Sequence, residues 1–283
     1  WGESNAVAFT NTVLGARTNR YGDFLDIACA ISARAPYYGL HKPENRYAKL
    51  VLDVSGLSQK LLGQSAFYPV LGAMIGRIAG ETVCAVTGMP TGATDDELKS
   101  LCAGVASTGA VALIHIVGVT PEAPDLDTAL GGQAPEQTVH VTHDMVIDAR
   151  NRLSLAEAGP IDSVALGSPH FSTDECRTLL RLADGKPFKV PVYICLGRHT
   201  LSELQADGTD TVLTNLGVEF VVDTCVVVTP ILPAEPGVLM TNSAKFAHYA
   251  TGNTGHLPVF GTLADCVASA QAGRVIWDEG VWS

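Results

Sequence analysis

The feature that most constrains the fold is a repeated order of apolar runs and capped helices. In 159–283, an apolar run at 162–167 precedes a helix capped by Ser172, and a run at 188–196 precedes a helix near 200–206. A third apolar run begins at Glu219. A succession of strand, turn and helix implies a parallel sheet with right-handed crossovers. The sequence therefore predicts an α/β fold with mainly parallel sheets.

The first half of the chain follows the same order. The runs AKLVLDVSG and ETVCAVTG have strand length, and the glycines of FYPVLGAMIGRIAG between them indicate a helix packed closely on a neighbour. Thr94 and the three acidic residues after it are typical of a helix start. A further buried strand is expected at 110–119, where we interpret His115 as a hydrogen-bonded core residue rather than a ligand.

We expect two α/β lobes, 1–158 and 159–283, with the boundary at Gly159-Pro160. The first lobe is expected to be incomplete on its N-terminal side, because the sequence opens without a methionine inside an apparently functional segment. With 283 residues, 47% of them hydrophobic and 17% charged, the chain has enough apolar surface for a large core.

Composition and charge exclude several classes of partner. The formal net charge of −11, without a basic stripe, argues against a nucleic-acid partner. A membrane span is not expected, because no run of about 18 apolar residues occurs. No charged and then apolar leader is recognisable, so a cytoplasmic location is the default expectation.

The cysteines do not form a local metal motif. Their number is odd, they are widely spread, and no CxxC pair occurs, so disulfides, zinc ribbons and ferredoxin-type motifs are not expected. Any metal site must gather its ligands from distant segments. The seven cysteines are Cys29, Cys84, Cys102, Cys176, Cys195, Cys225 and Cys266.

The stretch from Val221 to Gly255 passes directly from an apolar run to a dense group of polar side chains. We expect Glu219–Val228 to be a central strand, within which Asp223 needs a partner because burying a carboxylate is costly. After three prolines, a polar loop is expected at 241–254, where α/β proteins hold small anionic ligands. A merely solvated polar loop is the less favoured alternative. The polar residues are Thr241, Asn242, Ser243, Lys245, His248, Asn253 and Thr254.

Polar groups also follow two other predicted strands of the second lobe. Gly167-Ser168-Pro169-His170 and Gly197-Arg198-His199 come directly after apolar runs, at the sheet edge where ligands bind. His170 could act as an acid, a base or an orienting group, whereas a backbone-bonded histidine at a helix start is nearly as good an interpretation of His199. Cys266 falls in the first turn of a helix capped at 262–265, where the helix dipole favours a thiolate.

Two arginines follow the first predicted helix, which we expect to end near Gly15. In Arg17-Thr18-Asn19-Arg20, the guanidinium groups flank two polar residues, and such groups hold a carboxylate or a phosphate bidentately. A surface turn with ordinary salt bridges is an equally good interpretation of this segment.

Six segments together resemble the aconitase X family, a branch of the aconitase superfamily, and they extend over essentially the whole chain. They are GESNAVAF, NTVLGARTNRYGD, HIVGVTPEAP, GSPHFS, DTCVVVTP and TNSAKFAHYATGNTG. The resemblance implies α/β/α lobes around a cleft, a swivelling small domain fused upstream or supplied as a subunit, and hydro-lyase activity. It also implies a small hydroxy-acid substrate.

Within this family the resemblance implies one of two substrates. Bacterial members dehydrate cis-3-hydroxy-L-proline, here to pyrroline-2-carboxylate, and archaeal members dehydrate a phosphorylated mevalonate. GSPHFS carries serine at position 168, as the bacterial form does, so hydroxyproline is the expected substrate. The alternatives are the phosphomevalonate reaction and a non-catalytic subunit that binds a partner.

The resemblance also implies a cofactor and a set of site residues. An iron-sulfur cluster held by three cysteines is expected, with Cys225 and Cys266 as two ligands and the third upstream of the chain. Cys29 is a weaker candidate, and Cys84, Cys102, Cys176 and Cys195 are interpreted as packing residues. The base is expected on the swivelling domain. The expected catalytic residues are His170, Lys245 and His248, and the expected substrate-binding residues are Ser4, Asn5, Arg17, Thr18, Asn19, Arg20, Ser168 and Ser243.

Overall fold

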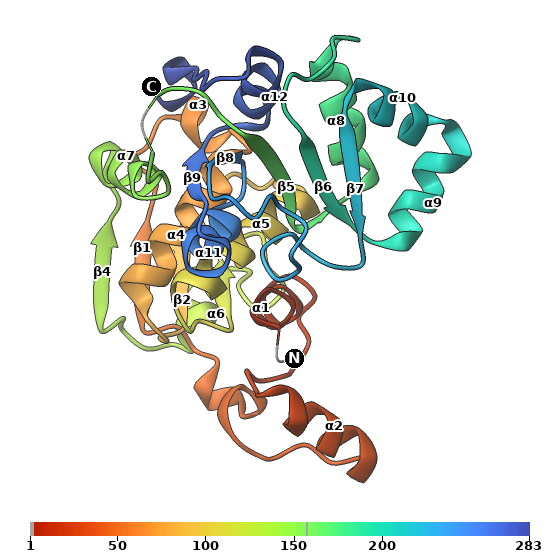
Figure 1. Ribbon diagram of the computed structural model, residues 1–283. Helices are drawn as coiled ribbons and strands as arrows, with labels where there is room; N and C mark the ends of the chain where they lie inside the picture. The colour runs from red at the N-terminus through yellow and green to blue at the C-terminus, as the bar shows by residue number, and fades with distance from the viewer. Residues whose placement is uncertain (1–2, 157) are drawn as a thin grey trace. The chain divides into compact units, whose positions relative to one another are not determined.

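The computed structural model describes residues 3–156 and 158–283 (Figure 1). The chain divides into two compact units, Trp1–Ile147 and Asp148–Ser283, which are described separately below. The predicted lobe boundary at 158/159 stays a prediction. Among the described residues, no helix is both long enough and apolar enough to cross a membrane.

In the first unit the strands are β1 (Leu50–Asp53), β2 (Cys84–Thr87), β3 (Ile114–Ile116) and β4 (Gln137–His140). Its helices are α1 (Ser4–Thr12), α2 (Asp23–Ser32), η1 (Gly39–His41), η2 (Pro43–Asn45), α3 (Gln59–Leu62), α4 (Phe67–Ala79), α5 (Asp95–Thr108) and α6 (Leu126–Leu130). Helix α7 (His143–Asn151) extends across the division between the units.

In the second unit the strands are β5 (Ser163–Phe171), β6 (Val192–Leu196), β7 (Val218–Val222), β8 (Val238–Thr241) and β9 (Leu257–Phe260). Its helices are α8 (Thr173–Ala183), α9 (Arg198–Asp207), α10 (Thr209–Leu216), α11 (Ala244–Thr254), α12 (Leu263–Ala272) and η3 (Glu279–Trp282).

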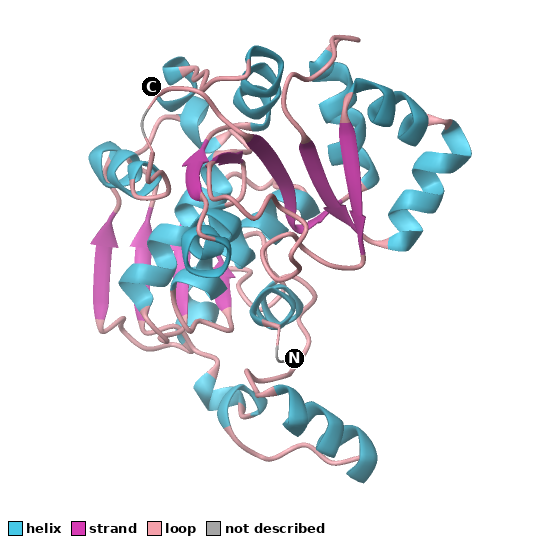
Figure 2. Ribbon diagram, viewed as in Figure 1, coloured by secondary structure: helices cyan, strands magenta, loops and turns pink. Residues whose placement is uncertain are grey.

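Each unit contains one parallel sheet, which confirms the predicted α/β class. The order is β3-β2-β1-β4 in the first unit and β7-β6-β5-β8-β9 in the second, and neighbouring strands within each sheet point the same way (Figure 2). Strand pairs of this kind need crossover connections, and helices such as α4 between β1 and β2 supply them. The capping box expected at Thr262 is present, and the helix caps expected at Thr94 and Ser172 are capping boxes as well.

Helices α4 and α5 pack closely because glycines line their contact, as the sequence predicted. A Cβ atom on Gly72 would overlap the carbonyl oxygen of Leu101, and one on Gly104 would lie 2.8 Å from the carbonyl oxygen of Pro69. Any larger residue at these positions would push the two helix backbones apart.

The second sheet is covered on both faces. Leu166 and Ile194 belong to an apolar cluster on one face, and their chain neighbours Ala165 and Cys195 belong to a different cluster on the other. Successive strand residues point to opposite faces, so the two clusters are separated by the sheet itself. Helix α12 contributes to the first cluster and α11 to the second.

The prediction of a central strand at Glu219–Val228 was wrong. Strand β7 ends at Val222 and is an edge strand of its sheet. Asp223 ends it with a left-handed φ of 59°, and the chain then turns. The apolar character that suggested a longer strand has another cause, because Val226 and Val227 are buried in the turns that follow.

The polar loop expected at 241–254 was also wrong, because most of it is helix α11. Ser243 is its N-cap, with the hydroxyl oxygen accepting a hydrogen bond from the Phe246 amide at 3.0 Å, and Gly255 ends it with a φ of 77°. The sequence TNSAKFAHYATGNTG buries Ala244, Phe246, Ala247 and Ala250, which gives the segment an apolar helical face.

Candidate active site

The carboxyl edge of the second sheet gathers several of the predicted site residues. The chain runs from β5 through β6 to β7 and then returns to place β8 on the other side of β5. Such a change of direction is where open α/β sheets bind ligands. Ser168 lies on β5 at this point, and Ser243 follows β8.

Hydrogen bonding joins the two serines. The hydroxyl of Ser243 donates to the backbone carbonyl of Ser168. Gly167, directly before Ser168, has a φ of 84°, and a Cβ atom there would overlap the carbonyl oxygen of Cys195 on the neighbouring strand. Only glycine accommodates both the positive φ and the close approach, so the backbone around Ser168 is tightly defined.

The thiol of Cys225 lies at the same edge, and its surroundings favour the ionised form. It is half-buried, and hydrogen bonds from the Cys195 thiol and the Ser168 hydroxyl reach its sulfur. The hydrogen bond with Cys195, helped by the charge of Lys245 and opposed by burial, lowers the pKa of Cys225. The same hydrogen bond, together with burial, raises the pKa of Cys195. Cys195, interpreted from sequence only as a packing residue, is therefore also a hydrogen-bond partner that favours the ionised form of Cys225.

This arrangement predicts that Cys225 reacts with iodoacetamide at lower pH than an ordinary thiol, because its thiolate persists below the usual pKa of about 8.5. Replacing Cys195 with alanine removes the donor and should move the reaction midpoint of Cys225 upward. The rates are measured by peptide mass spectrometry on folded, chelator-treated protein across pH 5–10. Equal midpoints in the two proteins would show that Cys195 does not tune the thiol.

The two predicted histidines of this unit differ in their surroundings. His170 is exposed, and its Nε2 donates a hydrogen bond to the carbonyl oxygen of Thr224 at 2.9 Å, one residue before Cys225. His248 is exposed on α11, and its ring contacts that of Tyr249 edge-on with centroids 4.9 Å apart. His170 thus lies beside the thiol segment, and His248 contacts Tyr249 of its own helix.

Asp223 is not a buried strand carboxylate. It is exposed, and its oxygens accept hydrogen bonds from the backbone amide of Arg198 at 2.9 Å and from the Arg198 guanidinium. The amide and guanidinium of Arg198 hold the pKa of Asp223 below its usual value. Asp223 thereby satisfies the first amide of α9, and Arg198 is already neutralised by a carboxylate.

The expected thiolate at Cys266 was wrong. Cys266 is 1% exposed and packs in the apolar cluster on the α12 face of the sheet, whereas Cys225 packs on the α11 face. Burial, with the nearby charge of Asp265, raises the pKa of Cys266 far above its usual value. The helix dipole is too weak to offset complete removal from water.

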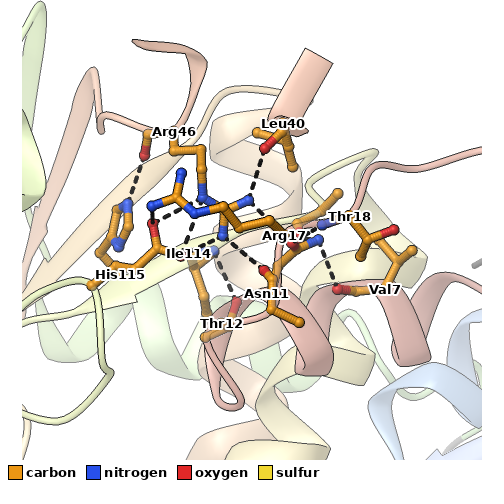
Figure 3. Close-up of polar contacts among 12 residues, drawn as sticks. Val7, Asn11, Thr12, Arg17, Thr18, Leu40, Arg46, Ile114 and His115 are labelled. Atoms are coloured by element: carbon orange, nitrogen blue, oxygen red, sulfur yellow. Dashed lines mark hydrogen bonds and ion pairs between the residues drawn. The ribbon is translucent and has the colours of Figure 1, made fainter. Parts of the chain in front are cut away.

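In the first unit, a buried arginine that sequence reasoning missed organises the segment after α1. Arg46 is 2% exposed, and its guanidinium donates to Glu122, Asn11 and two backbone carbonyls (Figure 3). The buried His115 donates from Nε2 to the Arg46 carbonyl oxygen at 2.7 Å, which confirms it as a hydrogen-bonded core residue. Burial lowers the pKa of His115, which favours its neutral ring.

Three of the predicted substrate-binding residues of this unit form hydrogen bonds within the protein. The Thr18 amide donates to Asn11 Oδ1 at 3.1 Å, and Asn19 Oδ1 accepts from the Leu40 amide at 3.3 Å. Arg20 Nη1 donates to the carbonyl oxygens of Ala106 and Gly109, both at 3.4 Å.

Two buried polar atoms of the predicted set have no hydrogen-bond partner among the described residues, namely Asn5 Oδ1 and Thr18 Oγ1. A ligand could satisfy either atom, because buried polar atoms are normally hydrogen-bonded. The side chain of Ser4 lies outside the described part of the structure.

A complete three-thiolate cluster site does not fit the described residues alone. Within 3–156 and 158–283, no group of three or more His, Cys, Asp or Glu side chains is placed to hold a metal ion. Cys225 fits as a single ligand, because its thiol is accessible and readily ionised.

Models of one known protein family match most of the chain. Three domain models of aconitase X match in order, the first domain at 1–44, the second at 48–151 and the third at 161–272. The chain belongs to the aconitase X family. The aconitase X holo-form structure from Thermococcus kodakaraensis superposes with a TM-score of 0.84 at 31% identity and covers 95% of this chain, which spans 67% of that one.

Two relatives of similar identity are both cis-3-hydroxy-L-proline dehydratases. The cis-3-hydroxy-L-proline dehydratases of Pseudomonas aeruginosa and Hypocrea jecorina are 42% and 41% identical, over 97% and 96% of this chain. The chain spans 48% and 47% of their lengths, about half. The phosphomevalonate dehydratase large subunit of Methanothermobacter thermautotrophicus is 39% identical over 90% of this chain and 61% of its own length.

Proposed function

We propose that this aconitase X chain forms part of a hydro-lyase that dehydrates cis-3-hydroxy-L-proline to pyrroline-2-carboxylate. The observation that carries the proposal is the 42% identity with the Pseudomonas aeruginosa dehydratase over 97% of the chain. Serine at position 168, in GSPHFS, supports the same choice.

The positive charge of the candidate residues also favours a substrate with one carboxylate. A phosphorylated hydroxy acid carries a phosphate as well as a carboxylate and needs more cations. The candidate cations are Arg17, Arg20, Arg198 and Lys245. Of these, Arg198 is paired with Asp223, and Arg20 donates to backbone carbonyls. Arg17, whose side chain is 52% exposed and whose Nη2 lies 3.9 Å from Glu122 Oε2, is the better candidate, and one such cation suits a single carboxylate.

Dehydration requires loss of the proton on the carbon next to the carboxylate and departure of the hydroxyl on the following carbon. A positioned acid must protonate the leaving hydroxide, and a base must take the carbon-bound proton. We assign the protonating and orienting roles to His170, Lys245 and His248, and carboxylate binding to the segment at 17–20 with Asn5 and Ser4. Ser168 and Ser243 complete the substrate-binding set, and the base is assigned to a swivelling domain.

We further propose an iron-sulfur cluster, with Cys225 as one ligand and the remaining ligands outside the described residues. A bound cluster supplies Lewis acidity toward the leaving hydroxyl. The small swivelling part is proposed as a further domain or a separate subunit, and the name "large subunit" of the archaeal relatives supports a partner. A cytoplasmic location is proposed as well, since all seven cysteines are free thiols.

The test is a dehydration assay on the complete protein, purified without oxygen, with cis-3-hydroxy-L-proline and phosphomevalonate offered separately. Product formation from the hydroxyproline is expected, with none from L-proline, which has no hydroxyl to lose. The trans isomer should react poorly, because its hydroxyl projects from the other face of the ring. If only phosphomevalonate is turned over, phosphomevalonate is the substrate. If iron-loaded protein turns over neither compound, the proposed activity is excluded.

A further inference from the structure

We propose that Arg46 and Glu122 are positioning residues, which hold the segment Ala16–Arg20 so that Arg17 presents one uncompensated positive charge to a carboxylate. This segment is called the 16–20 loop below. The identity of the carboxylate rests on the proposed function, whereas the positioning itself rests on contacts within the first unit.

Arg46 is bound on every side of its guanidinium group. Nε donates to both carboxylate oxygens of Glu122, at 3.1 and 2.8 Å, and Nη2 donates to Glu122 Oε1 at 2.5 Å. Nη2 also donates to the carbonyl oxygen of Ala16 at 3.1 Å, and Nη1 donates to Leu40 at 3.0 Å. Lysine could not replace this planar fork of donors.

Asn11 extends the effect of Arg46 to the next residues of the loop. Its Oδ1 accepts from Arg46 Nη1 and from the backbone amide of Thr18, each at 3.1 Å, while its Nδ2 donates to the carbonyl oxygens of Val7 and Ala112. The 16–20 loop is therefore fixed at Ala16 and Thr18, the two residues that flank Arg17.

The charges around Arg17 add up to one surplus positive charge. The bidentate contact with Arg46 neutralises Glu122, and the nearby His115 is buried, which favours its neutral form. Arg17 Nη2 lies 3.9 Å from Glu122 Oε2, and the Arg17 side chain is 52% exposed. At that distance Glu122 attracts the guanidinium without a hydrogen bond, so the donors of Arg17 stay available for a bidentate carboxylate.

If the ion pair of Arg46 and Glu122 only stabilises the fold, removing it should not change substrate binding through Arg17. A double-mutant cycle that combines Glu122→Gln with Arg17→Gln in the complete protein therefore distinguishes a positioning role from a purely structural one. If Glu122 acts through Arg17, Glu122→Gln should raise KM for the hydroxy acid about tenfold and Arg17→Gln about thirtyfold, with kcat within about twofold. The double variant should then match Arg17→Gln alone.

A matched control is Glu136→Gln, which makes the same chemical change in an exposed pair with Lys49 at 3.0 Å. This control should leave KM and kcat unchanged. If the effects on KM multiply in the double variant, or if Glu122→Gln lowers only the melting temperature, Glu122 has a structural role and the proposal is overturned.

A second measurement does not depend on activity, so it separates failure of this proposal from failure of the proposed function. Arg46→Lys should speed hydrogen exchange of the Thr18 amide at least tenfold, because Asn11 loses the contact that orients it. The exchange rates of amides within β2 report global unfolding of the unit, and they should increase less than the rate of the Thr18 amide. Equal changes at Thr18 and in β2 would overturn the positioning role whether or not the enzyme dehydrates hydroxyproline.

Discussion

Replacing Cys225 with alanine should lower the iron content of the complete protein at least about tenfold and remove the dehydration activity with it. The thiol lies half-buried at the carboxyl edge of the second sheet, where the Cys195 thiol and the Ser168 hydroxyl stabilise its ionised form. The fold should survive, because the side chain is small and only partly removed from water. Iron is measured by colorimetric analysis of anaerobically purified protein, together with its circular dichroism spectrum.

Cys266→Ala makes the same chemical change at a thiol that we do not expect to reach iron. It should leave iron content and activity near the wild-type level and lower the free energy of unfolding by about 1 kcal/mol, since a packed sulfur is lost from the core. Full iron content in Cys225→Ala, or loss of iron only in Cys266→Ala, would reverse the assignment of the ligand.

The two units contribute different chemistry to the proposed reaction. The first holds a cationic loop, in which the buried Arg46 and Asn11 hydrogen-bond the backbone on both sides of Arg17. The second offers ionisable and hydroxyl groups at a sheet edge, with Cys225, Ser168 and His170 on neighbouring segments. We thus assign carboxylate binding to residues of the first unit and departure of the hydroxyl to residues of the second. Substitutions at Arg17 and Glu122 should mainly change KM, whereas Cys225→Ala should mainly lower kcat.

Local sequence signals predicted most of the fold. The strands around Val51 and Ala85, the capping boxes and the glycine contact between α4 and α5 all depend on residues close in sequence, so one chain suffices to infer them. The segment at 241–254 was misjudged because its polar residues drew more weight than its four buried apolar positions, although Ser243 is a typical N-cap.

The site was only partly predictable, because its contacts join residues far apart in sequence. Arg46 and Glu122 are separated by 76 positions, and although Glu122 lies in the segment HIVGVTPEAP, no local pattern links it to Arg46. Cys195 could have been identified, since it lies one residue before the end of β6, which pairs with the strand that precedes Cys225. The buried position of Cys266 depends on which face of α12 packs on the sheet, and the cap alone does not reveal it.

Replacing Arg46 with methionine should lower the free energy of unfolding by about 3–5 kcal/mol, because it leaves Glu122 without its buried partner. Methionine keeps much of the volume but donates no hydrogen bond, so Asn11 Oδ1 and the carbonyl oxygens of Ala16 and Leu40 also lose their donor. Urea unfolding followed by far-UV circular dichroism, with hydrogen exchange of β1–β3 amides, measures the change in the first unit.

Arg152→Met is the matched control, because Arg152 forms an exposed pair with Asp148 at 2.7 Å, and its loss should leave the free energy of unfolding nearly unchanged. The pH dependence provides a second check. Burial would raise the pKa of Glu122, but the hydrogen bonds and charge of Arg46 outweigh burial and lower it. Such a carboxylate stabilises the fold above its unfolded pKa of about 4.3 and loses that contribution as pH falls through its folded pKa. The difference between wild type and Arg46→Met should therefore be full at pH 7 and shrink below about pH 4; a difference independent of pH would assign the loss to packing rather than to the ion pair.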